Sequence, residues 1–157
     1  MARTNFAKLN HIFSLKQNAM NTNKLLVGAL LGGVAFFLSG WVLYEMVFKS
    51  ILASMMTTIE GVNKSAPDMV AMIVGNLVFG LLFAYIFEKW AGIRTFMGGL
   101  VAGATIGFLI AFGYDSIMHG LTNLMSWGGV VLDSVIYAVM GGLAGGLIGW
   151  WLGYNRK

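Results

Sequence analysis

The sequence contains no cysteine, which excludes disulfide bonds and thiolate metal sites anywhere in its 157 residues. Histidine is nearly absent as well: of the two, His11 lies in the N-terminal tail and His119 far along the chain, so they offer no paired haem ligands. Metalloprotease, serine-hydrolase and phosphate-loop motifs are missing. The sequence therefore predicts neither an enzyme nor a cofactor.

Charge is scarce too. Charged residues make up 10% of the chain, against roughly 25% in a soluble domain. Four long apolar stretches take up most of the length, at residues 25–48, 69–87, 96–114 and 130–152. A helix needs roughly 20 apolar residues to cross a bilayer core. We therefore expect an all-α integral membrane protein, a four-helix bundle whose helices run antiparallel, up and down in turn.

Lysine and arginine are distributed unevenly between the two sides of this bundle. One side holds eight of them, at positions 3, 8, 16, 24, 89, 94, 156 and 157, and the other holds only Lys49 and Lys64. The positive-inside rule places both termini in the cytoplasm. The net charge of +4 is then explained by basic residues that set the topology and lie at the membrane surface. Nucleic acid is not an expected partner.

The domain organisation follows from the apolar stretches. Residues 1–24 form a basic tail, either disordered or a short surface helix, residues 25–154 form the transmembrane domain, and residues 155–157 are a basic end. The connection at 49–68 is predicted to be either a helix at the outer interface or a continuation of the first span. Glu88 and Lys89 are expected to form a surface pair.

Glycine recurs at every fourth position in the last two stretches. The predicted packing residues are Gly99, Gly103 and Gly107 in the third and Gly141, Gly145, Gly149 and Gly153 in the fourth. Such spacing allows close helix approach where lipid gives no hydrophobic drive. We expect these faces to be in contact, within the chain or between copies. The bundle would then be tight at its cytoplasmic half and wider outside, unless large side chains fill the outer half.

Acidic residues gather near the outer ends of the spans, together with one histidine. The candidates for cation or proton binding are Glu45, Asp68, Asp115, Asp133 and His119. Charged groups inside spans are costly and usually face the bundle interior or water. A ring of carboxylates with a histidine could hold a divalent cation or relay protons, and which metal, if any, is left open. The alternative is helix-end residues solvated among lipid headgroups, with Asp68 and Asp133 favoured by the helix dipole.

Two segments resemble a known family. GWVLYEMVF in the first stretch and LDSVIYAVMGGLAGGLIGWW in the last resemble a bacterial family of small four-span membrane proteins of unknown function. In that family a Gly-x-x-Trp-Tyr-like run ends the first helix, and an acidic residue, tyrosines and a small-residue tract mark the last. Here the aromatic pair is spread to Trp41 and Tyr44. The resemblance covers about residues 25–152, implies a bacterial inner-membrane location and brings no catalytic residue.

Two functions remain as hypotheses. The first is a structural or accessory membrane subunit, whose partners are the lipid bilayer and either further copies or another membrane subunit. The alternative is cation or proton binding or transport through an outward vestibule lined by Glu45, Asp115, His119 and Asp133. Convergence of the acidic side chains on one point would favour the second.

Overall fold

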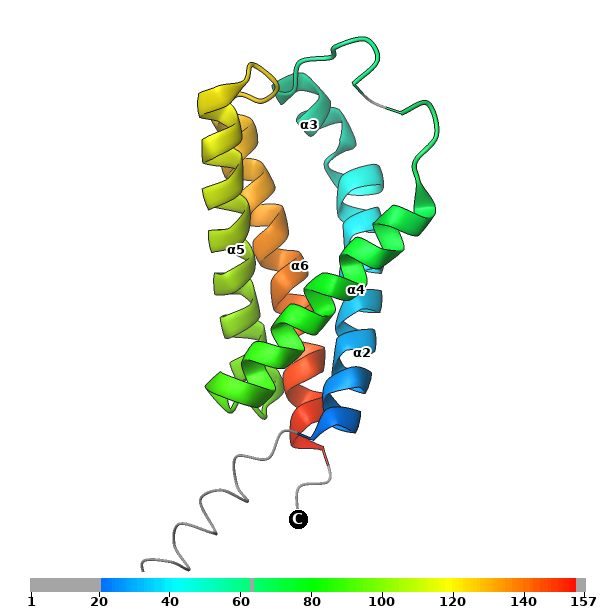
Figure 1. Ribbon diagram of the computed structural model, residues 1–157. Coiled ribbons are helices and arrows are strands. Elements are labelled where there is room, and N and C mark those ends of the chain that lie inside the picture. The colour runs from blue at the N-terminus through cyan, green and yellow to red at the C-terminus, as the bar shows by residue number, and fades with distance from the viewer. Residues whose placement is uncertain (1–20, 63, 155–157) are drawn as a thin grey trace, which may run out of the picture.

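The computed structural model describes residues 21–62 and 64–154, and its regular elements are all helices. Four of them are long and apolar enough to cross a membrane: Thr22–Val47, Met69–Ala91, Phe96–Leu121 and Trp127–Gly153. These helices pack together, which confirms the predicted all-α class (Figure 1). Most of the predicted tail lies outside the described residues, as does the basic end at 155–157. The last residues of the 1–24 segment form the first turn of a helix.

The first span consists of α2 (Thr22–Gly40) and a π-helical continuation, η1 (Trp41–Val47). A short helix, α3 (Lys49–Met55), follows after Phe48 and covers only the first part of the connection at 49–68, so the first span does not continue unbroken into it. The second span is α4 (Met69–Tyr85) with the π-helical η2 (Ile86–Ala91), and the third and fourth are α5 (Phe96–Leu121) and α6 (Trp127–Gly153). The helices outrun the apolar stretches, most clearly at the end of α5.

Each long α-helix begins after a side chain that caps it. Asn21, Asp68, Thr95 and Ser126 each accept a hydrogen bond from the backbone N–H three residues on. These caps satisfy backbone donors that have no partner within the helix. For Asp68, the cap is a structural role that accounts for an acidic residue at this position.

The four spans form two close pairs of helices, and one helix of each pair contacts the other pair. α5 packs along α6, α2 packs against α4, and α2 also contacts α6. Figure 1 shows α4 crossing α2 obliquely, so that α4 and α5 diverge toward the end of the bundle that carries α3. We call this the loop end, where the connections 56–68 and 122–126 lie. The opposite end, where Asn21 and Tyr154 lie, is the terminal end.

Glycine faces hold the α5–α6 pair together. Gly103 lies against the backbone of Gly141 and Gly145, and Gly99 and Gly107 make the same kind of contact one turn before and after. A Cβ on Gly103 would overlap the carbonyl oxygen of Gly141. Such close backbone approach is the packing mode that small residues permit between membrane helices.

A second glycine crossing joins α2 to α4. Gly80 lies directly against the backbone of Ala29, Gly32 and Gly33. Near this crossing the rings of Phe36 and Phe83 meet edge to face with centroids 5.1 Å apart, and both side chains are buried. Close backbone contact at glycine therefore holds both helix pairs, α5 with α6 and α2 with α4.

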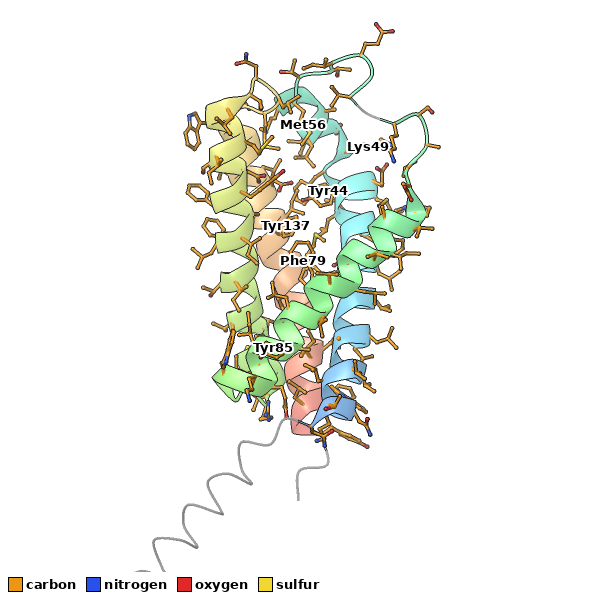
Figure 2. The ribbon with its side chains drawn as sticks, viewed as in Figure 1. Tyr44, Lys49, Met56, Phe79, Tyr85 and Tyr137 are labelled. Atoms are coloured by element: carbon orange, nitrogen blue, oxygen red, sulfur yellow. The ribbon has the colours of Figure 1, made fainter. Side chains whose placement is uncertain are left out.

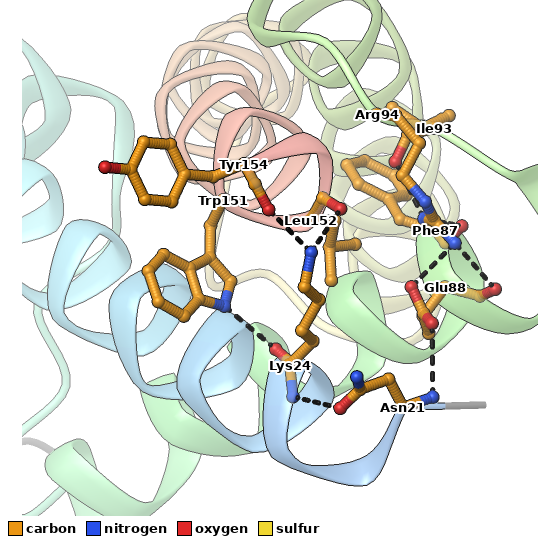
Figure 3. A network of polar contacts seen from close by, with 9 residues as sticks. All are labelled: Asn21, Lys24, Phe87, Glu88, Ile93, Arg94, Trp151, Leu152 and Tyr154. Carbon is orange, nitrogen blue, oxygen red and sulfur yellow. Dashed lines mark hydrogen bonds and ion pairs between the residues drawn. The ribbon is translucent and has the colours of Figure 1, made fainter. Parts of the chain in front are cut away.

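Polar contacts fasten the terminal end (Figure 3). Lys24 Nζ donates to the carbonyl oxygen of Tyr154 at 2.6 Å, and Trp151 Nε1 donates to the carbonyl oxygen of Lys24 at 3.2 Å. Glu88 pairs with Arg94 at 2.7 Å, and its side chain is 4% exposed. The predicted surface pair of Glu88 with Lys89 is therefore wrong: η2 turns Glu88 toward the start of α5 and leaves Lys89 exposed.

Candidate functional site

Two carboxyl groups meet inside the bundle near the loop end. Asp115 lies in the last turns of α5 and Asp133 in the second turn of α6, and each residue is only 8% exposed. Both side chains line the same cavity. Two carboxylates on one poorly solvated cavity repel each other, and a proton held by either one removes this repulsion. The antiparallel pairing of α5 with α6 brings these residues together from 18 positions apart.

The two carboxyl groups differ in their partners. The hydroxyl of Tyr44 donates a hydrogen bond to Asp133 Oδ1 at 2.6 Å, so the first span holds this carboxyl in place. Asp115 Oδ2 is buried and has no hydrogen-bond partner among the described residues. Leaving a buried acceptor unsatisfied costs about 1 to 3 kcal/mol. Asp115 is therefore the member of the pair that remains open to a ligand.

A cavity of about 460 Å³ adjoins the pair. Its walls come from all four spans, and they are Tyr44, Phe79, Ile110, Ala111, Tyr114, Asp115, Asp133 and Tyr137. Figure 2 shows Tyr44, Phe79 and Tyr137 in the space between the α5–α6 pair and the α2–α4 pair. Phe79 and Tyr137 meet edge to face with ring centroids 5.9 Å apart. The volume falls in the range of small-molecule sites, about 300 to 1,000 Å³.

A second cavity of about 240 Å³ lies closer to the loop end. Its lining includes Met56, Thr57, Met118 and Met125, and it shares Tyr114 and Asp115 with the larger cavity. Backbone hydrogen bonds tie the covering segments together: Thr57 N donates to the Leu124 carbonyl at 2.9 Å, and Ser126 N donates to the Met55 carbonyl at 3.0 Å. Asp115 thus borders both cavities.

Three predicted site residues lie away from the pair. Glu45 is exposed on the outside of η1 and pairs with Lys49 at 2.8 Å. Asp68 caps α4 and lies 3.5 Å from Lys64. His119 Nδ1 is bonded to the Met125 carbonyl at 2.7 Å, and its ring packs against Trp127 with centroids 4.5 Å apart. The structure therefore brings together Asp115 and Asp133 and not the whole predicted ring.

Tyr44 and Tyr137 were not among the predicted site residues, yet both line the larger cavity. Tyr44 faces the cavity while its neighbour Glu45 faces out, and both belong to the π-helical segment η1. A π-helix has a wider turn than an α-helix, so the usual spacing does not give the face of a residue within it. The available signal was the tyrosine hydroxyl itself, which needs a partner when buried.

Within residues 21–62 and 64–154, no three histidine or acidic side chains are grouped so as to hold a metal ion. Comparison of the chain with protein-family models, with curated proteins and with solved structures finds no match in any of the three.

Proposed function

We propose that this multi-pass membrane protein takes up and releases a cation at the Asp115–Asp133 pair, in exchange for a proton. The observation that carries the proposal is the buried, unpartnered Oδ2 of Asp115, at the border of two cavities. Ionisable groups within spans are costly, and they mark ion pathways and proton relays. A carboxyl with one buried oxygen that has no hydrogen-bond partner fits a binding role better than a structural one.

The residues divide the work of exchange between them. Tyr44 fixes Asp133 by donating its hydroxyl hydrogen, which leaves the facing carboxyl of Asp115 free to change its protonation. With one proton between the two carboxyl groups, the pair carries a single negative charge. A cation that enters beside the pair balances the second negative charge, so the proton leaves as the cation arrives. The second cavity, of about 240 Å³, gives the departing proton a route toward the loop end.

Titration of the pair is expected to be visible by infrared spectroscopy of the full chain in liposomes. A pH-difference spectrum of the unaltered protein should contain the carbonyl band of a buried protonated carboxyl, and the double variant Asp115→Asn, Asp133→Asn should lose it. The matched control is Asp68→Asn, because asparagine caps a helix about as well as aspartate and this residue lies outside the site. Persistence of the band in the double variant would refute the proposal.

We further propose that the terminal end faces the cytoplasm of a bacterial inner membrane and the loop end faces outward. The support is the eight-to-two distribution of lysine and arginine. Because the chain has no cysteine, single-cysteine labelling is free of background. On intact cells, an impermeant maleimide is expected to label Glu60→Cys at the loop end and to label Trp90→Cys at the terminal end only after permeabilisation. The opposite pattern would invert the orientation.

A structural or accessory subunit is the second candidate function. It is favoured by an apolar groove of about 340 Å³ on the α5–α6 surface, lined by Leu100, Ala104, Val135, Ala138, Val139, Gly142 and Leu143. In this role the groove would receive a helix of another copy or of another membrane subunit. Asp115 and Asp133 would then serve only packing, so replacing either one should destabilise the protein. Mutation of these two residues therefore distinguishes the two candidate functions.

A further inference from the structure

We infer that the cation taken up beside Asp115 is organic: an ammonium group attached to an apolar, preferably aromatic, body. This inference rests on the proposed function and names its substrate class. It follows from the walls of the larger cavity, which combine two carboxyl groups with four aromatic side chains, Tyr44, Phe79, Tyr114 and Tyr137.

The donor set argues against a divalent metal ion. A divalent cation such as Ca²⁺ takes six to eight oxygen ligands. The described residues offer no third acidic or histidine side chain near Asp115 and Asp133. The larger cavity otherwise presents aromatic rings and the aliphatic side chains of Ile110 and Ala111. A weakly hydrated ammonium group needs no such oxygen cage, because aromatic faces attract it directly.

The wall of the larger cavity is partly polar and partly apolar. The carboxyl pair and the Tyr44 hydroxyl lie together, and Phe79, Ile110 and Ala111 supply the apolar part of the wall. A ligand with a positive head and an apolar body would match both parts at once. An anion would be repelled by the carboxylates. A neutral apolar molecule would leave Asp115 Oδ2 without a partner.

The larger cavity is bordered by two spans, α4 and α5, that make few contacts with each other. Phe79 on α4 and Tyr114 on α5 both border the larger cavity, yet the extensive contacts in the described part of the chain join α5 to α6 and α4 to α2. In Figure 1 the α4 and α5 ribbons diverge toward the loop end. The flank between α4 and α5 would face acyl chains in a bilayer, where the apolar body of an amphiphilic cation accumulates.

The test measures binding of benzyltrimethylammonium to the full chain in phosphatidylglycerol liposomes by titration calorimetry. We expect saturable binding with release of a proton, seen as a dependence of the heat on the ionisation enthalpy of the buffer. Neopentylbenzene has the same shape without the charge and is expected to bind at least about tenfold more weakly. Equal binding of the two compounds would overturn the inference.

Variants locate the binding. Tyr137→Leu removes a ring face and is expected to weaken binding by about tenfold to thirtyfold, whereas Tyr137→Phe keeps the ring and should change it by less than about threefold. Tyr85→Leu is the matched control, because Tyr85 packs against Trp90 at the terminal end and does not line the cavity (Figure 2). A loss equal to that of Tyr137→Leu in the control would show that the effect is not local.

The possible failures are distinguishable. If the infrared band of the carboxyl pair is present and benzyltrimethylammonium does not bind, the substrate class is wrong and proton binding stands. If Na⁺ or K⁺ releases the proton and benzyltrimethylammonium does not, the cation is inorganic. Competition by phosphatidylcholine in the liposomes would support the same ammonium chemistry and identify a lipid headgroup as its source. Absence of the infrared band would refute the proposed function itself.

Discussion

Replacing Gly103 with leucine is expected to separate α5 from α6 and to lower the free energy of unfolding by about 3 kcal/mol or more. The reason is geometric: even a Cβ at this position overlaps the carbonyl oxygen of Gly141, and the neighbouring Cα of Gly145 is 3.0 Å away. These atoms belong to backbone and cannot rotate aside as a side chain would. The measurement is thermal unfolding of the purified protein in detergent, followed by circular dichroism.

Gly113→Leu provides the control on the same helix. A Cβ at Gly113 meets nothing within 4 Å, and the residue is exposed. Leucine there would face lipid and gain helix propensity, worth up to about 1 kcal/mol over glycine. The two variants have identical composition, so a difference between them isolates the helix contact. Equal loss of stability in both would show that the glycine contact does not hold α5 to α6.

The α5–α6 seam and the α2–α4 crossing differ in how far the sequence indicates them. Along α5 and α6 the glycines recur at every fourth position, and this period marks a face. The crossing of α2 with α4 rests on Gly80 alone in the second span, opposite Gly32 and Gly33. A single glycine forms no repeating pattern, so the contact between α2 and α4 was not predicted from the sequence. Hydropathy marked the four spans, whereas their ends depend on capping residues such as Thr95 and Ser126.

The candidate site was predictable from the sequence only where its residues lie in regular α-helix. Asp115 and Asp133 lie in regular α-helix, and the pairing of adjacent antiparallel spans brings them together. The dipeptides Tyr44-Glu45 and Tyr114-Asp115 are chemically alike, yet their orientations are reversed. Tyr44 faces the cavity and Glu45 is exposed, whereas Asp115 is buried and Tyr114 is 64% exposed. The π-helical geometry of η1 accompanies this reversal, and composition carries no signal for it.

Asp115→Leu is expected to make the protein more stable and to abolish cation exchange. The substitution removes a buried oxygen that has no partner, and the cavities on both sides of Asp115 leave room for the leucine. Relief of an unsatisfied buried polar group predicts a gain of about 1 to 3 kcal/mol in the free energy of unfolding. Thermal unfolding in detergent measures the gain, and proton release on addition of benzyltrimethylammonium measures the loss of exchange.

Asp133→Leu should behave in the opposite way in stability, although it also abolishes exchange. Its carboxyl accepts the hydrogen bond from Tyr44, so its removal leaves that partly buried hydroxyl without its partner, at a cost of about 1 kcal/mol. An accessory subunit predicts a different pattern, because carboxyl groups kept for packing would destabilise the protein when either one is replaced. A loss of stability in both variants would therefore favour the subunit role. A gain in Asp115→Leu alone would mean that the chain keeps a destabilising carboxyl at this position, as a functional site requires.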